Sequence, residues 1–451
     1  MVNGPTVNPQ GQLHLDGAQH NVVVIGGGQA GLSMSYCLGV RGVDHLVLDK
    51  ATVGNEWRDR RWDSFCLVTP NWQCALPGFP YQGPEPHGFM LRDEIVSYLE
   101  SYARSFGPPL AEHTTATRLT QRPRGGFEIR SSRGMITADQ VVVATGPYQV
   151  PLTPRLGHRL PDDVRQIHSS QYRNPAELPP GAVLVVGTGQ SGGQIAEDLH
   201  LAGRAVHLAT GSAPRVTRFY RGRDVVDWLA DMGYYARGIE EFSDADAVRF
   251  RANHYVTGRD GGRDIDLRAF ARDGMRLYGR LAAVSGGTVH FADDLRANLD
   301  RADAVAESIK DSIDAHIDAR RIVAPREARY APVWEPAGLT SALDLEAAGI
   351  ATVIWATGFG RDCRWIEVPV FDGRGYPTHR RGVTSCEGLY FLGLPWQHTW
   401  GSGRFCGVGT DAAYLADRIC AGPLREVHWL AGTPASTWPR DEDWAAPRTV
   451  A

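Results

Sequence analysis

One short pattern occurs twice in this chain and constrains its fold more than any other feature. The segments "VIGGGQAGLSMSYCL" (24–38) and "VVGTGQSGGQIAEDL" (185–199) overlay without a gap. Each joins an apolar run to a Gly-x-Gly-x-x-Gly turn and then to a helix-like stretch. A continuously apolar run is typical of a strand that is buried on both faces of a parallel sheet. The repeat therefore predicts two α/β units, each built from a strand, a glycine turn and a helix.

The first copy carries the remaining parts of a dinucleotide-binding unit. Its glycines are Gly26, Gly28 and Gly31, and a second strand, "HLVLD", ends in Asp49. In such a unit the glycines make the tight turn, admit a pyrophosphate and let the helix pack on the strand. An acid about 20 residues further on accepts hydrogen bonds from the ribose hydroxyls. We therefore expect the first copy to bind an unphosphorylated adenosine ribose, as in FAD or NAD.

The second copy differs from the first at the position that matches this acid, where Thr210 replaces Asp49. Its glycines are Gly187, Gly189 and Gly192. No acid lies within 204–223, a segment that contains Arg215, Arg218, Arg221 and Arg223. A carboxylate repels a 2′-phosphate, whereas guanidinium groups bind phosphate through paired hydrogen bonds. We therefore expect NADPH at the second copy; the alternative is that these arginines only solvate a loop.

A second pair of repeats suggests how the two units are connected. The segments "VVVATGP" (141–147) and "VIWATGF" (353–359) are apolar strands that end in Ala-Thr-Gly. We interpret them as the places where the chain leaves one nucleotide domain and later returns to it. On this interpretation, residues 20–150 and 351–435 form a discontinuous FAD-binding domain, and residues 151–350 form an inserted NADPH-binding domain.

The inserted domain is expected to contain a helical insertion over about 224–320. The patterns "DLRAFARDGMRLYGRLAAV" and "DAVAESIKDSIDAHIDARR" have helical spacing, and the strand-like "TVHFA" lies between them. The proline-rich segment 323–341 is predicted to be an extended connector, and residues 1–19 and 436–451 to be tails. The predicted fold class is α/β, with two Rossmann-like dinucleotide-binding domains, the second inserted into the first.

Composition disfavours several other classes of protein. The chain has 451 residues and a formal net charge of −4, so its charge does not point to nucleic acid or to a membrane surface. We find no signal peptide and no apolar run of the roughly 18 residues that span a bilayer, so we expect a cytoplasmic protein. The seven cysteines form no Cys-x-x-Cys or Cys-x4-Cys pair, and no metal motif is present. The oligomeric state is open, and a homodimer is one outcome.

The order of these motifs resembles the flavin-containing monooxygenases, which include the plant YUCCA-type members. The segment "WRDRRWDSFCLVTPNWQCALPGFPY" (57–81) is similar to the family's Trp, Tyr/Trp-Asp and Leu-Pro run near the flavin. "GLYFLGLPWQHTWGSGRFCGVGTDAAYLADRI" is similar to the segment that returns to the flavin. The family signature Phe-x-Gly-x-x-x-His-x-x-x-Tyr/Phe is half present: His168 and Tyr172 match, whereas Asp162 and Val164 replace Phe and Gly.

The resemblance implies an FAD-dependent, NADPH-consuming monooxygenase. In this family NADPH reduces FAD, O2 forms a flavin C4a-hydroperoxide, and one oxygen atom passes to a nitrogen or sulfur atom of a small substrate. Three alternatives stay open: Baeyer–Villiger oxygenation of a carbonyl, another NADPH:flavin oxidoreductase or oxidase, and an NADPH-binding sensor without enzymatic activity. A disulfide reductase would need the missing cysteine pair.

The repeats and the resemblance together predict a set of site residues. Asn71, in "V-T-P-N", is the implied catalytic hydrogen-bond donor, with a turn asparagine as the alternative. His168 is the candidate for orienting NADP+. The predicted substrate pocket contains Trp396, His398, Trp400 and Tyr220. The predicted cofactor-binding residues are Gly26, Gly28, Gln29, Ala30, Gly31, Asp49, Lys50, Trp57, Arg58, Thr145, Gly146, Gly187, Gly189, Gln190, Ser191, Gly192, Thr210, Arg215, Arg218, Thr357, Gly358 and Gly393.

Overall fold

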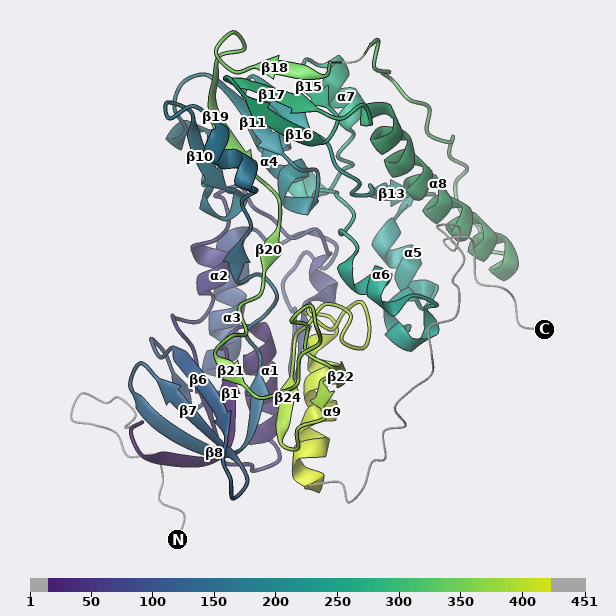
Figure 1. Cartoon of the computed structure of the whole chain (residues 1–451). Helices are drawn as coiled ribbons and strands as arrows, with labels where there is room; N and C mark the ends of the chain where they lie inside the picture. The colour runs from purple at the N-terminus through teal and green to yellow at the C-terminus, as the bar shows by residue number, and fades with distance from the viewer. Residues whose placement is uncertain (1–14, 339, 423–451) are drawn as a thin grey trace.

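The first glycine turn belongs to a ten-stranded mixed sheet in the computed structural model, which describes residues 15–338 and 340–422 (Figure 1). Strand β1 (Ala18–Ile25) pairs in parallel with β2 (His45–Leu48) and β8 (Gly134–Val143). The last four residues of β1 are buried, and they are the apolar run seen in the sequence. The other strands are β5 (Leu110–Ala111), β6 (Ala116–Gln121), β7 (Phe127–Ser131), β21 (Ile366–Glu367), β22 (His379–Arg380), β23 (Val383–Thr384) and β24 (Leu389–Phe391).

The second glycine turn belongs to a separate sheet of five parallel strands. Its order is β10 (Arg165–His168), β19 (Ile350–Trp355), β11 (Ala182–Val186), β12 (Val206–Ala209) and β15 (Arg276–Tyr278). Strand β11, which precedes the turn, is buried along its whole length. Each glycine turn therefore follows an inner strand of its own sheet, which confirms the predicted pair of Rossmann-like units.

Helices α1 (Gln29–Gly39) and α4 (Gln190–Leu201) begin directly after the two turns. Helix α1 shares a hydrophobic core with α3 (Arg92–Phe106) and α9 (Val408–Ala421), whereas α4 packs on the second sheet. The short α2 (Asn55–Arg58) follows β2. Within the described part of the chain, no helix combines the length and the apolar character needed to cross a membrane.

The expected return of the chain at residue 351 is wrong, because β19 lies in the second sheet between β10 and β11. The two Ala-Thr-Gly strands are in fact counterparts: β8 flanks the first glycine-turn strand and β19 flanks the second. The chain re-enters the first sheet with β21. The ribbon of β9 (Val150–Pro151) and β20 (Phe359–Gly360) follows these two strands and joins the two connections between the sheets (Figure 1). The division into separate domains stays a prediction.

The insertion is partly helical, with α5 (Val225–Asp231), α6 (Ala245–Phe250), α7 (Leu267–Arg272) and α8 (Leu295–Arg320). The predicted helix over "MRLYGRLAAV" is wrong, since this segment forms β15 and β16 (Leu281–Ser285). Gly274, at a φ of +107°, follows α7 and separates the two geometries. Strand β16 pairs with β17 (Thr288–Phe291), the predicted "TVHFA" strand, and β17 pairs with β18 (Ala342–Asp344).

Two further ribbons are β3 (Ala75–Leu76) with β4 (Phe79–Pro80), and β13 (Phe219–Tyr220) with β14 (Arg223–Asp224). The connector 323–338 contains no helix or strand, as predicted. The predicted tail at 436–451 lies outside the described residues.

Candidate functional site

A cavity of about 1270 Å³ is lined by both glycine turns. Open α/β sheets bind ligands at the carboxyl ends of their strands, where these turns lie. The predicted residues that line it are Gly26, Gly28, Gln29, Ala30, Asp49, Lys50, Trp57, Thr145, Gly146, Gly189, Gln190, Ser191, Arg218, Gly358, Gly393, Trp396 and Trp400. The predicted residues outside its lining are Gly31, Arg58, Asn71, His168, Gly187, Gly192, Thr210, Arg215, Tyr220, Thr357 and His398.

The first turn is closed by contacts that require glycine. Gly26 has a φ of +112°, and a Cβ on Gly31 would lie 1.7 Å from the carbonyl oxygen of Gly26. Helix α1 therefore starts directly against β1. No side chain caps the N-terminus of α1, and its first residues line the cavity. Unpaired N–H groups at a helix start favour an anionic ligand group.

Asp49 is held beside this turn by two backbone hydrogen bonds. Its Oδ2 accepts from the Gly27 N–H at 2.5 Å, and its Oδ1 accepts from the Ala51 N–H at 2.8 Å. The carboxylate thus lies at the end of β2 and lines the cavity. The neighbouring Lys50 pairs with Glu56 at 3.0 Å.

The second turn has the same backbone arrangement as the first. Its hydrogen bond to the strand end runs in the opposite direction, because here the turn supplies the acceptor. A Cβ on Gly192 would lie 1.9 Å from the carbonyl oxygen of Gly187, whose φ is +104°. Thr188, which matches Gly27 in the repeat, accepts a hydrogen bond through Oγ1 from the Gly211 N–H at 2.9 Å. A side chain of the turn thus occupies the role that the Asp49 carboxylate has in the first unit.

Thr210 at the end of β12 is only 3% exposed. Its hydroxyl donates to the carbonyl oxygen of Tyr278 at 2.7 Å and accepts from Asn298 Nδ2 at 3.3 Å. The strand end therefore has no carboxylate, as the sequence indicates, but Thr210 is turned into the fold.

Arg215 does not provide the predicted phosphate contact. Its Nε donates to Asp303 at 2.6 Å, its Nη1 lies 3.4 Å from Asp264, and its guanidinium covers the ring of Tyr330 at 4.1 Å. The side chain is 3% exposed. The sequence prediction is wrong here because acids from distant parts of the chain neutralise this arginine.

The other arginines of this segment are bound within the protein as well. Arg218 lines the cavity, but both Nη atoms donate to the Val68 carbonyl oxygen, and Asp224 lies 3.4 Å away. The two remaining members form ion pairs, Arg221 with Asp314 and Arg223 with Asp231. Each arginine of the basic segment 215–223 therefore has a carboxylate partner within the protein.

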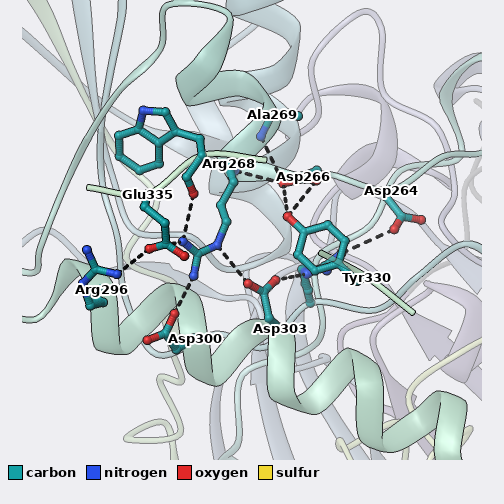
Figure 2. A network of polar contacts seen from close by, with 11 residues as sticks. Asp264, Asp266, Arg268, Ala269, Arg296, Asp300, Asp303, Tyr330 and Glu335 are labelled. Atoms are coloured by element: carbon teal, nitrogen blue, oxygen red, sulfur yellow. Dashed lines mark hydrogen bonds and ion pairs between the residues drawn. The ribbon is translucent and has the colours of Figure 1, made fainter. Parts of the chain in front are cut away.

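The acids around Arg215 belong to a network that fastens α8 to α7 and to the loop after β12 through two buried arginines (Figure 2). Arg268, which is 1% exposed, donates to Asp303 at 2.9 Å and to Asp300 at 2.5 Å. Both acids lie on α8. Arg268 also pairs with Glu335 at 3.0 Å. Because Asp303 binds both buried arginines, it links α8 to two other parts of the unit.

Asn71 is not brought to the cavity. Its Nδ2 donates to the Glu85 carbonyl oxygen at 2.9 Å, and its Oδ1 accepts from the Met90 N–H at 2.7 Å, so both amide atoms fix a loop. Gln73, two residues on, lines the cavity and is 3% exposed. Its Oε1 is buried and accepts no hydrogen bond from the described residues. Sequence reasoning missed Gln73 because its spacing carries no motif.

Trp57 lines the cavity and stacks on Phe405 at 5.7 Å, whereas Arg58 is turned away and pairs with Glu100 at 2.6 Å. Arg61 lines the cavity instead, 5.3 Å from the Trp57 ring centre. Burial lowers the pKa of Arg61, and it has no ion pair with any acid of the described residues. The run "WRDRR" gave no signal that would separate these arginines.

His168 connects the ends of two strands instead of facing the cavity. Its Nε2 donates to the Gly358 carbonyl oxygen at 3.0 Å, and its Nδ1 accepts from the Ser170 N–H at 3.2 Å. Burial lowers the pKa of His168, which agrees with a neutral ring that donates once and accepts once. The ring thus positions Gly358, which lines the cavity.

Aromatic side chains form one wall of the cavity. Tyr235 lies 4.7 Å from Trp400, and Phe242 lies 5.2 Å from Trp396 between ring centres. Tyr234 also faces Trp396. All five line the cavity, so the insertion and the segment before α9 build this wall together.

Two of the predicted pocket residues lie elsewhere. His398 is placed between Glu240, at 3.6 Å, and Asp411, at 3.8 Å, while Tyr220 donates to Asp314 at 2.8 Å. The prediction assumed an extended segment, but Trp396 has a φ of +51°. The alternation of a strand is therefore lost before His398.

The seven cysteines are all free thiols, and no group of metal-ligating side chains is found among the described residues. A family model described as pyridine nucleotide-disulphide oxidoreductase matches residues 23–257. An uncharacterized CzcO-like oxidoreductase of Geobacillus kaustophilus is 34% identical over 403 residues, which cover 88% of this chain and 98% of the relative.

More distant relatives share parts of the sequence or the fold. The indole-3-pyruvate monooxygenase YUCCA4 of Oryza sativa is 31% identical over 194 residues, covering 39% of this chain and 44% of that protein. The flavin-containing monooxygenase of Stenotrophomonas maltophilia has a TM-score of 0.60 at 21% identity, covering 90% and 99% of the two chains. An ornithine N-hydroxylase of Kutzneria has a TM-score of 0.60 at 16% identity, covering 89% and 99%.

These similarities agree with the geometry of the two sheets and the shared cavity. The family model covers both glycine turns, and the flavin monooxygenases have the same two-sheet fold over nearly their whole length. The chain therefore belongs to the pyridine nucleotide-disulphide oxidoreductase family, and it shares the fold of the flavin-dependent monooxygenases.

Proposed function

We propose that this enzyme binds FAD at the first glycine turn, takes hydride from NADPH at the second, and transfers one atom of O2 to a nitrogen or sulfur atom of a small organic substrate. The observation that carries the proposal is the cavity, because both turns open onto the same space. The Kutzneria structure is named with reduced FAD, NADP+ and L-ornithine, which supports two nucleotides in this fold.

FAD fits the first turn. Its pyrophosphate would lie at the uncapped start of α1, and its ribose hydroxyls would donate to Asp49. Trp57 and Gly393 approach from the segments that flank the turn, and a Cβ on Gly393 would lie 2.8 Å from the Cβ of Ala30. The bound flavin supplies the reduction of O2 and the oxygen transfer, while the protein supplies position and water exclusion.

The pyrophosphate of NADPH fits the start of α4, which is also uncapped and where Gln190 and Ser191 line the cavity. Thr210 stands at the position of Asp49 and its hydroxyl is turned into the fold, so a 2′-phosphate meets no fixed negative charge at this strand end. The absence of this charge favours NADPH over NADH at the second turn.

The reacting end of the cavity is the aromatic wall with Gln73. The rings exclude water from the substrate, which favours oxygen transfer over loss of H2O2. Gln73 takes the role that the sequence assigned to Asn71, because Gln73 lines the cavity and its Oε1 accepts no hydrogen bond from the described residues. We place the substrate between Gln73 and Trp400.

The test follows both products of the reaction, using the holoprotein with NADPH, ¹⁸O2 and a panel of amines, thioethers and ketones. The expected result is one labelled oxygen in an amine or thioether product, and one in water, for each NADPH consumed. One H2O2 for each NADPH, with no oxygenated product from any substrate, would identify an oxidase. Labelled esters from ketones alone would identify Baeyer–Villiger activity.

The cytoplasmic location and the homodimer stay predictions of the sequence. Light scattering on the purified holoprotein tests the dimer, and fractionation of cells that express the full chain tests the location. A monomer, or a membrane-bound fraction, would contradict them.

A further inference from the structure

The segment after β12 is the place where the second unit would distinguish a phosphorylated ribose. It consists of Thr210, Gly211 and Ser212, and it matches the end of β2 in the first unit, where Asp49 lies. Thr210 is buried, whereas Ser212 is exposed. The four arginines of the following segment are held by carboxylates of the protein, so another group must provide positive charge here.

Helix α8 brings such a group to this position. Asn298 on α8 donates through Nδ2 to the Thr210 hydroxyl at 3.3 Å. Arg301, one turn further along α8, donates through Nη1 to Asn298 Oδ1 at 3.4 Å. Two side-chain contacts therefore connect the end of β12 to a guanidinium group.

Arg301 differs from its neighbours in having no acidic partner. It is exposed, and no carboxylate of the described residues lies within 4.0 Å of it. Arg280, which follows β15 at the same edge of the sheet, pairs with Asp294 at 2.5 Å, and Arg296 on α8 pairs with Glu335 at 2.5 Å. Arg301 is thus available for a negative group of a ligand.

We propose that Arg301 binds the 2′-phosphate of NADPH and determines the preference for NADPH over NADH. This inference rests on the proposed binding of a nicotinamide nucleotide at the second turn. A guanidinium group binds a phosphate through short, charge-assisted hydrogen bonds, and the hydroxyl of Ser212 adds a donor. The specificity residue thus comes from α8, outside the strand–turn–helix unit and outside the arginine cluster of 215–223.

The experiment measures nucleotide binding to the oxidised holoprotein, without turnover. Dissociation constants are determined for NADP+, NAD+, 2′,5′-ADP and 5′-AMP by titration calorimetry. Arg301→Ala is expected to weaken NADP+ and 2′,5′-ADP by about tenfold to a hundredfold and to leave NAD+ and 5′-AMP within about twofold. Arg301→Lys is expected to retain part of the preference, because it keeps the charge without the fork of donors.

Arg280→Ala is the matched control, since it removes an exposed arginine of the same edge that already has an acidic partner. Arg280→Ala is expected to leave the ratio of the dissociation constants for NADP+ and NAD+ unchanged. Equal weakening of NADP+ and NAD+ by Arg301→Ala, or no change in either, would overturn the role of Arg301. If the unaltered holoprotein binds neither nucleotide, the proposed function itself fails, which is a different result.

Discussion

At the first glycine turn an aspartate accepts a hydrogen bond from the turn, whereas at the second a threonine of the turn accepts one from the residue after the strand. The two turns otherwise share their backbone, including the close approach of the third glycine to the first. On the proposed function, the preference for a particular nucleotide therefore does not come from the turn. It comes from the end of the neighbouring strand and from the elements that cover it.

The two units also differ in what surrounds that strand end. In the first, the charged residues Asp49 and Lys50 at the strand end both line the cavity. In the second, the strand end is covered by α8, which is fixed by buried ion pairs (Figure 2). The two copies of the repeat therefore have different electrostatic environments at their strand ends.

The largest effect on FAD binding by the first unit is expected for Gly31→Ala. Its Cβ would lie 1.7 Å from a backbone oxygen that cannot move without opening the turn. We expect loss of nearly all bound FAD, measured by flavin absorbance of the purified protein. The control is Gly39→Ala at the end of α1, where a Cβ meets nothing within 4 Å. Retention of full flavin by Gly31→Ala would contradict the packing of this turn.

In the second unit, Arg215→Ala is expected to lower the free energy of unfolding by about 3–5 kcal/mol, because it removes a buried guanidinium group that compensates the charges of Asp303 and Asp264. Chemical denaturation of the holoprotein measures this. Since Arg215 is committed to Asp303 and Asp264, the variant should weaken NADP+ and NAD+ by the same factor. A selective loss of NADP+ with unchanged stability would restore the prediction made from sequence.

Alanine substitutions at the two matching strand-end positions test whether the two units bind different nucleotides. Asp49→Ala is expected to weaken FAD by about tenfold to a hundredfold, because hydrogen bonds to a charged group contribute about 1.5–3 kcal/mol. Thr210→Ala, at the matching position, should leave the affinity for FAD unchanged. Fluorescence titration of the apoprotein with FAD measures both. Equal affinities in the two variants would show that the units are not specialised as proposed.

The smallest effect is expected for Gln73→Ala at the reacting end. It should raise the share of NADPH that ends as H2O2 by a few fold, because a cavity donor is lost while both nucleotide sites stay intact. Peroxide formed for each NADPH measures this coupling. Asn71→Ala should instead lower the free energy of unfolding by about 1–3 kcal/mol, since two loop hydrogen bonds are lost. The reverse pattern would favour Asn71 as the functional amide.

Much of the fold could be predicted because its signals are local. Apolar runs, glycine spacing and the change from Asp49 to Thr210 all lie within short windows of sequence, and the structure contains the corresponding strands, turns and helices. The family resemblance is confirmed by the comparisons.

The errors share one physical cause, which is contact between residues far apart in the chain. Arg215 meets acids that lie about 50 and 90 residues later, so an excess of arginine in one segment says little about local charge. The side-chain amide of Asn71 forms its hydrogen bonds with the backbone of Glu85 and Met90. The strand ending at Trp355 joins the second sheet because of its partners and not because of its own composition.

Helix α8 has a consequence for how this enzyme can diverge. It carries Arg301 near its start, and farther along Ile309 and Ser312 line the cavity, so on the proposed role of Arg301 one helix contributes both to the 2′-phosphate site and to the cavity wall. Its anchorage by Arg268 does not involve Arg301. On the proposed role of Arg301, the choice of reducing nucleotide behaves as an interchangeable module: evolution or an engineer can change it on the helix surface while the inherited sheet, turn and flavin geometry stay untouched.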